Sequence, residues 1–381
     1  MTERLQPEMH GTSDKQLPHV PEGMPPLVLE GRPTSFFEFW PAWIMYFPVA
    51  LQWLLLSVRY RSLSLPLIAN PAIPLSGMVG VAKTAAFDAA GETARQWILP
   101  WITYTVSEIS EREQAEILAP RLADSDLRFP LVVKPNIGCR GAGVKLLKAQ
   151  AGLEACLASF PAGAELQFQQ LSQWEAEAGI FYVRFPGEKH GRITSLALKY
   201  TPFVTGDGQR TLGELVAADP RAGQLLHLYR RRHSQNWESV IARGEPYRLV
   251  FSASHSKGAV FRNAPDLISQ PLTEALDAIF ADIQGMYYGR LDVKFRDVDS
   301  LRAGSDFEII EINGASSESI HIWDRNASLW EAVRALLQQY LTLFKLGAES
   351  RRLGHRPPGL RVLYSAWRHE SNLVKQYPDN D

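Results

Sequence analysis

The stretch FPLVVKPNIGCRGAGV, residues 129–144, joins a short β-rich run, a lysine and a glycine-rich loop. Lys134 ends the apolar run, and Gly138, Gly141 and Gly143 follow it. Glycines let backbone N–H groups approach an anion closely, and a nearby ammonium adds a point charge. The pattern therefore suits a polyphosphate, although an ordinary hairpin turn would use the same residues. Because the lysine precedes the glycines, the pattern is neither G-x-x-x-x-G-K-[ST] nor G-x-G-x-x-G.

A second signal consists of GRLDVKFRD at 289–297 and DFEIIEINGASSES at 306–319. Both runs are typical of strands and the residues between them are turn-rich, so we expect an antiparallel hairpin. Strand alternation places Arg290, Asp292 and Lys294 on one face, with Leu291, Val293 and Phe295 opposite.

The second strand of this hairpin should present Glu311 and Asn313 on one face, with Ile310 and Ile312 opposite. Two carboxylates and an amide oxygen from paired strands suit Mg²⁺ bridged to nucleotide phosphates. The alternative is a solvated sheet face with a cross-strand ion pair.

These motifs resemble the ATP-grasp superfamily, specifically the carboxylate–amine ligases around D-alanine–D-alanine ligase and cyanophycin synthetase. TPFVTGDGQRTLGELVAADPRAG (201–223) is similar to the V-x-G-D-G-x-x-T-x-x-E-L-I segment of the cyanophycin synthetase group. The stretch 242–268 is similar to that group's strand and small-residue loop. The resemblance covers about residues 127–326. It implies an α+β ATP-grasp fold, in which two α+β lobes grip ATP.

The resemblance implies a ligase that joins a small-molecule carboxylate to an amine through an acylphosphate, releasing ADP and phosphate. Asp292, Glu311 and Asn313 would bind Mg²⁺, or Mn²⁺ in its place. Lys134 and the glycine loop would hold the ATP phosphates, and Arg290 would stabilise the oxyanion of the tetrahedral intermediate. Lys257 would approach the γ-phosphate, unless it is a plain surface lysine.

The strand that links the lobes in relatives presents an acidic residue to the adenine, whereas here Gln169 and Gln170 lie near that place. Glu177 is the expected ribose carboxylate, with Glu175 as a close competitor. After the metal hairpin, relatives carry N-x-x-P-G where this chain has NGASS at 313–317, so the acceptor substrate should differ. In the phosphate loop, Cys139 and Arg140 replace the usual small residues.

Two other functions are compatible with the same residues. One is a membrane-tethered protein that binds ATP without turnover, and the other is a kinase-like use of the fold. The complete set of metal ligands favours an enzyme.

Composition limits the partners and the compartment. The 381 residues carry a net charge of −1 and no large Lys/Arg cluster, which argues against nucleic-acid binding. Two cysteines exclude a disulfide framework and suit a reducing compartment, so we expect a cytoplasmic protein.

The N-terminal part divides into a polar lead, residues 1–34, expected to be disordered, and a hydrophobic segment, residues 35–61. Residues 36–58 are long enough to span a bilayer, although two prolines would bend the helix. Trp40, Trp43 and Trp53 suit a lipid–water interface, and the following Arg59 and Arg61 favour a cytoplasmic exit. The segment therefore spans or lies on the cytoplasmic face of the membrane, or it packs on the catalytic core.

Residues 62–125 form a region preceding the ATP-grasp domain, where relatives carry a small α/β domain. The ATP-grasp domain itself should span 126–347. Within it, Leu272, Leu276, Ile279, Phe280 and Ile283 predict one helix, and a capping box at Ser328 opens a last helix that Gly347 should close. Residues 348–381 are a C-terminal tail without an interpretable pattern.

Overall fold

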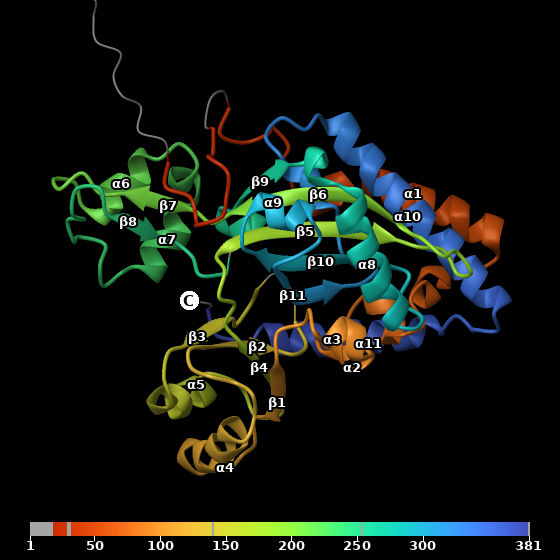
Figure 1. The fold of residues 1–381 in the computed structure, drawn as a ribbon, viewed down its shortest axis with the longest axis horizontal. Coiled ribbons are helices and arrows are strands. Elements are labelled where there is room, and N and C mark those ends of the chain that lie inside the picture. Colours follow the sequence, from red (N-terminus) through yellow and green to blue (C-terminus); the bar gives the residue numbers. More distant parts are fainter. Residues whose placement is uncertain (1–17, 29–31, 139–140, 253, 380–381) are drawn as a thin grey trace, which may run out of the picture.

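The protein is α+β, as predicted from its sequence, in a computed structural model that describes residues 18–28, 32–138, 141–252 and 254–379 (Figure 1). The strands form a five-stranded sheet, a four-stranded sheet and a two-stranded ribbon. Neighbouring strands within each of them are antiparallel.

The five-stranded sheet is the centre of the larger lobe. Its strands follow the order β11-β10-β5-β6-β9. They are β5 (Ala176–Val183), β6 (Arg192–Tyr200), β9 (Val260–Asn263), β10 (Tyr288–Phe295) and β11 (Phe307–Asn313).

Helices cover both faces of this sheet (Figure 1). The helix α8 (Gln270–Asp282) packs on one face with α2 (Ala85–Asp88), α3 (Glu92–Arg95) and α9 (Val298–Arg302). All five apolar residues of the predicted α8 stripe are fully buried. The helix α10 (Leu329–Arg352) packs on the other face through Leu343 and Leu346.

The smaller lobe is built on the sheet β1-β4-β2-β3. Its strands are β1 (Trp101–Thr105), β2 (Leu131–Pro135), β3 (Lys145–Leu147) and β4 (Glu165–Gln170), packed against α4 (Glu111–Ala123) and α5 (Leu153–Ala158). Both β1 and α4 come from residues 62–125. The region 62–125 is therefore divided: β1 and α4 belong to the smaller lobe, whereas α2 and α3 pack on the larger lobe.

A third unit with its own apolar core follows β6. It contains β7 (Phe203–Thr205), α6 (Leu212–Ala218), α7 (Leu226–Arg232) and β8 (Pro246–Arg248). The predicted capping box is present, since the Thr211 hydroxyl accepts from the Glu214 N–H and the Glu214 carboxylate accepts from the Thr211 N–H.

Short 3₁₀ helices complete the chain. They are η1 (Leu65–Ile68), η2 (Pro74–Gly77), η3 (Gln150–Gly152), η4 (Ala222–Leu225), η5 (His255–Lys257), η6 (Pro265–Leu267) and η7 (Ile320–Trp323).

Residues 18–28 are ordered, in contrast to the disordered lead predicted for this part of the chain. Met24 and Leu27 are buried in the core of the larger lobe. Burial of these two apolar side chains offsets the conformational entropy that the segment loses on ordering. The polar residues around them could not supply this compensation. Residues 1–17 and 29–31 lie outside the described part.

The hydrophobic N-terminal segment forms α1 (Ala42–Tyr60), which starts after Pro41 instead of at residue 36 and keeps Pro48 inside. One side of α1 packs on α10. The other side exposes apolar residues, and Trp43 and Leu55 are each 72% exposed. By length and composition, α1 is also apolar enough to cross a membrane.

Gly347 does not end α10, contrary to the prediction from the sequence. The capping box at Ser328 and Glu331 begins the helix as expected, but the helix continues to Arg352. A Cβ at Gly347 would lie 2.3 Å from the carbonyl oxygen of Leu65. The glycine thus permits close contact with η1, which is a packing role and not a capping role.

Asn70 attaches the N-terminal region to the central sheet, and it is fully buried. Its Oδ1 accepts from the Tyr287 and Tyr288 N–H groups at 3.0 and 2.9 Å, and its Nδ2 donates to the Tyr288 carbonyl at 2.7 Å. Because Asn70→Ala leaves these groups buried and unpaired, it should lower the free energy of unfolding by about 2–4 kcal/mol. Urea unfolding measures this, with exposed Asn372→Ala as control; a loss below about 1 kcal/mol would contradict it.

Candidate functional site

The β10–β11 hairpin sets two residue pairs side by side. Arg290 lies opposite Asn313, and Asp292 lies opposite Glu311, which confirms the predicted antiparallel hairpin. The apolar residues Leu291, Val293 and Phe295 are fully buried on the other face, as alternation predicts.

A β-bulge after Asp292 changes one prediction. Val293 pairs with Ile309, so Ile310 is the extra residue of β11. Ile309 and Ile312 are buried in the core, whereas Ile310 is only half-buried and is not part of it. Ile310 therefore does not share the core face with Ile312.

Asp292 is 4% exposed and lies between two cations. The Arg290 guanidinium holds both its oxygens, at 2.8 Å from Nε and 3.1 Å from Nη2, and the Lys199 ammonium lies 3.0 Å away. The Asn313 amide donates to the same carboxylate at 3.4 Å. Burial alone would raise the pKa of Asp292, but Arg290 and Lys199 keep it well below its usual range.

Glu177 on β5 shares the Lys199 ammonium. Its two oxygens lie 2.9 Å from Lys199 and 2.9 Å from Lys294. Burial opposes ionisation, yet these two ammonium groups lower the pKa of Glu177 to about 2. Its competitor Glu175 is exposed and lies 3.9 Å from Arg248. Of the two glutamates, only Glu177 belongs to the buried ion network.

Lys134 reaches from the smaller lobe to the hairpin of the larger lobe. Its Nζ donates to Gln169 Oε1 at 2.7 Å and to the Ile310 carbonyl at 3.1 Å. Burial lowers the pKa of Lys134 to about 8, against the attraction of Glu311. Glu311 itself pairs with Lys83 at 2.7 Å.

Two cations of this site, Lys83 and Lys199, are not predicted by the sequence analysis. Lys199 projects from β6 toward the acidic face, and Asp292 and Glu177 raise its pKa despite its burial. The Gly77–Gly80–Lys83 spacing, a glycine-rich loop ending in lysine, is the signal that would have found Lys83. It lies outside every motif that carried the resemblance.

The two predicted adenine-site glutamines point to different places. Gln169 is buried beside Lys134, and its Nε2 makes no hydrogen bond to a described residue. Gln170 accepts from the Arg128 N–H at 2.8 Å on the other side of β4. Alternation along the strand separates them, so only Gln169 joins the site.

The glycine loop connects β2 to β3, which are hairpin neighbours. Gly141 and Gly143 both have φ of +68°, which favours glycine. The Lys257 ammonium donates to the Gly141 carbonyl at 3.0 Å, and burial lowers the pKa of Lys257 to about 8. Lys257 and the loop are therefore brought together. Cys139 and Arg140 lie outside the described residues.

The C-terminal tail forms α11 (Leu360–Val374), which crosses near these loops. The Glu370 carboxylate accepts from the Gly80 N–H at 2.6 Å, and the Tyr377 hydroxyl donates to the Ile137 carbonyl at 2.9 Å. Asp379 pairs with Arg231 of the third unit at 2.7 Å. The tail thus contacts all three parts of the molecule.

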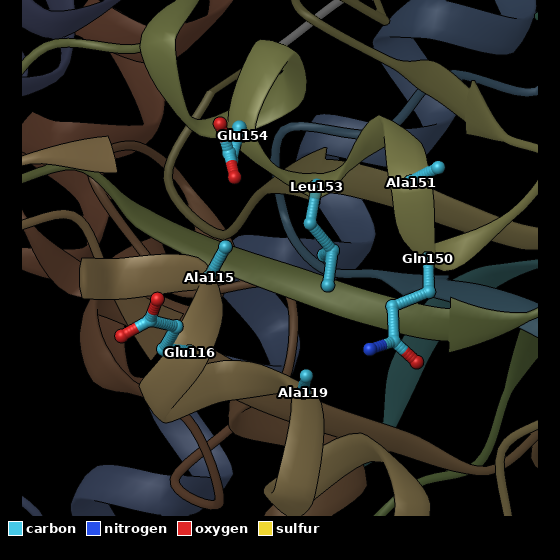
Figure 2. Close-up of a pocket in the computed structure, with 7 residues that line it drawn as sticks. All are labelled: Ala115, Glu116, Ala119, Gln150, Ala151, Leu153 and Glu154. Atoms are coloured by element: carbon cyan, nitrogen blue, oxygen red, sulfur yellow. The ribbon is translucent and has the colours of Figure 1, made fainter. Parts of the chain in front are cut away.

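A cavity of about 350 Å³ lies elsewhere, between α4 and α5 (Figure 2). It is lined by three alanines and a leucine together with two glutamates and a glutamine. None of the hairpin, Lys134 or glycine-loop residues borders it. We therefore place the candidate site at the hairpin and not in this cavity.

Lys199→Met tests the ion network. Removing the shared ammonium leaves Glu177 and Asp292 with weaker compensation, so the free energy of unfolding should fall by about 3 kcal/mol at pH 8. Both carboxylates have lowered pKa values in the folded protein, so their stabilisation is complete above about pH 5 and disappears as pH falls through the folded pKa. The deficit of the variant should therefore shrink below about pH 4.

Urea unfolding at several pH values measures this deficit, with the exposed Lys189→Met as control. An equal stability of Lys199→Met and wild type at pH 8 would show that the shared ammonium does not stabilise the fold.

Comparison with known proteins returned no matching family and no matching curated protein. Among solved structures, a bifunctional glutathione synthetase from Pasteurella multocida matches over 69% of this chain and 36% of its own, with 14% identity and a TM-score of 0.34. A D-Ala:D-Ser ligase from Enterococcus faecalis matches over 71% of this chain and 62% of its own, with 11% identity and a TM-score of 0.39. A D-alanine–D-alanine ligase from Bacillus anthracis, complexed with ATP, matches over 72% and 68%, with 12% identity and a TM-score of 0.36.

The chain thus spans about a third of the glutathione synthetase and less than two thirds of the D-Ala:D-Ser ligase. Since these TM-scores lie below 0.5, the function proposed next is based on the chain's own residues.

Proposed function

We propose that the protein is an ATP- and Mg²⁺-dependent ligase that joins a carboxylate to an amine through an acylphosphate. The observation that supports this is the meeting of Asp292, Glu311 and Lys134 at one place between two lobes. Phosphoryl transfer needs charge neutralisation and alignment more than covalent catalysis, and this site concentrates both signs of charge.

The residues at the hairpin fit a divalent metal. Asp292 and Glu311 are opposite each other, and the Asn313 amide lies beside Asp292. Mg²⁺ at an ATP site commonly uses one or two carboxylates and takes its other ligands from phosphates and water. When bound, the metal would neutralise charge on the β- and γ-phosphates.

The ATP itself would lie between the lobes. We assign Lys134 and Gly138, Gly141 and Gly143 to the phosphates, because the lysine and the loop belong to the same hairpin. Gln169, with its free buried amide N–H, is assigned to the adenine edge. Glu177 is assigned to the ribose. Gln170 is not assigned to the ATP site, since its side chain lies on the other side of the strand.

The reaction would proceed in two displacements. A substrate carboxylate oxygen forms a bond to the γ-phosphorus while the bond to the bridging oxygen breaks and ADP leaves. The amine nitrogen then bonds to the acyl carbon, and the C–O bond to phosphate breaks. Within this part of the chain, Arg290 donates three hydrogen bonds to described residues, which leaves two of its five N–H groups for the developing oxyanion. Lys257, at the glycine loop, would face the γ-phosphate.

An assay of ADP and phosphate release with a panel of amino acids and dipeptides tests the proposal. Wild type should release both products with Mg²⁺, and Glu311→Gln should be slower by about 100-fold because it removes a metal ligand. The control Glu274→Gln changes an exposed glutamate of α8 and should leave the rate unchanged. Lys134→Ala should weaken ATP binding in calorimetry.

Other outcomes distinguish the alternatives. ADP without free phosphate would indicate a kinase, and ATP binding without ADP would indicate a binding protein. A wild-type rate in Glu311→Gln would contradict the metal assignment.

We also propose that α1 lies on the cytoplasmic face of a membrane and does not span it. Met45, Val49 and Leu56 are buried toward α10, so lipid cannot surround the helix while this packing persists. The opposite side is an apolar stripe at helical spacing, and Arg59 follows it. The stripe consists of Trp43, Phe47, Leu51, Leu54, Leu55 and Val58.

Flotation with vesicles containing anionic lipid tests this contact. Wild type should float with the vesicles, whereas the double variant Trp43→Ser/Leu55→Ser should stay in the dense fraction. Because both side chains are 72% exposed, the variant should keep its unfolding midpoint. Trp367→Ser, on the exposed side of α11, is the control and should float. Wild type that remains dense would show that α1 is not a membrane helix.

A further inference from the structure

We propose that the Glu318 carboxylate receives the amine substrate as an ammonium ion and then takes its proton. This inference rests on the proposed ligase function and adds the acceptor side of the site. Glu318 directly follows residues 313–317, the stretch where the sequence departs from the N-x-x-P-G of its relatives.

Glu318 is tied to the reacting centre through Arg290. The Arg290 Nη1 donates to the Glu318 carbonyl at 3.0 Å, while Nε and Nη2 of the same guanidinium hold Asp292. One rigid planar group thus joins the proposed metal ligand Asp292 to the main chain of Glu318. The residue that bears the proposed acceptor carboxylate is therefore held next to the arginine assigned to the oxyanion.

Among the residues that the structure describes, the Glu318 carboxylate has no lysine or arginine as an ion-pair partner, unlike the other acidic groups of the site. Asp292, Glu177 and Glu311 are each paired with lysine or arginine. Within the described part of the chain, the hydrogen-bond donor to the Glu318 carboxylate is the Trp323 indole N–H, at 3.1 Å. A largely buried carboxylate without a counter-ion is costly, and a bound ammonium would supply the missing charge.

Glu318 is not fully buried as a residue. Part of its surface is exposed, although burial is sufficient to raise its pKa. Burial together with the Glu318 charge raises the pKa of Tyr340 on α10 to about 12, so this phenol stays protonated.

These groups define the class of substrate. The amine would arrive protonated and pair with Glu318, beside the Trp323 indole that already donates to this carboxylate. Transfer of one proton from nitrogen to the Glu318 oxygen frees the lone pair. That lone pair forms the C–N bond as the C–O bond to phosphate breaks and phosphate leaves with its electron pair.

Glu318→Gln separates this role from a structural one, with Glu274→Gln as the matched control. An acid whose folded pKa is raised costs stability as pH rises above its unfolded pKa, near 4.3. The glutamine variant should therefore unfold about 1–2 °C above wild type at pH 8, and the difference should vanish near pH 4. A variant less stable than wild type at pH 8 overturns the claim of an uncompensated charge.

A kinetic experiment compares two amines, each combined with the same acid from the panel that supports ADP release. Hydroxylamine is small and largely uncharged at neutral pH, so it needs no ammonium site, whereas glycinamide carries an ammonium. Glu318→Gln should keep hydroxylamine-supported ADP release within about 2-fold and raise the KM for glycinamide by about 10-fold or more, which corresponds to the loss of one charged contact.

An unchanged KM for glycinamide, or an equal loss with both amines, overturns the assignment of Glu318 alone. Absence of hydroxylamine-supported ADP release in wild type with every acid of the panel overturns the ligase function, and the inference with it.

Discussion

The ammonium of Lys199 lies 2.9 Å from Glu177 and 3.0 Å from Asp292, and much of the site depends on this shared cation. Lys199, Glu177 and Asp292 belong to β6, β5 and β10, which are neighbouring strands of the five-stranded sheet. Like charges on adjacent strands repel when they are buried, so the carboxylates tolerate each other only because cations alternate with them. The same alternation keeps each acidic group ionised, which is the state that metal and phosphate chemistry needs.

A second lysine forms a contact between the two lobes. Lys134 crosses from the smaller lobe and donates to the Ile310 carbonyl. Ile310 is the extra residue of the β-bulge, so the carbonyl that accepts from Lys134 belongs to a residue outside the regular pairing of β11 with β10. A local irregularity in one strand thus provides the docking point for the other lobe.

The sequence predicted the parts of the site whose pattern is local. Strand alternation was sufficient for Asp292, Glu311 and the buried face behind them, and a capping box was sufficient for the starts of α6 and α10. Alternation could not reveal the bulge, since one extra residue leaves no mark in composition. Lys83 was not predicted from the sequence because its loop has no periodicity and its partner Glu311 lies more than 200 residues away.

Glycine was misread for a related reason. Gly347 near a predicted helix end has the appearance of a cap, but the close approach of η1 that requires it comes from a distant segment. Contacts of this type, including Asn70 with β10, depend on tertiary structure alone.

The C-terminal helix has a consequence for how the chain is handled by proteases. None of the residues of α11 is buried, and its link to α10 is mostly exposed, from Leu353 to Gly359. An exposed link before a lightly held helix is a preferred site of nicking. Cleavage there would release the segment that bonds Gly80 and Ile137 while both lobes keep their cores, so a stable fragment ending near residue 355 should accumulate during limited digestion. Bound nucleotide would then alter the rate of that cut to the extent that it shifts the glycine loop against Tyr377.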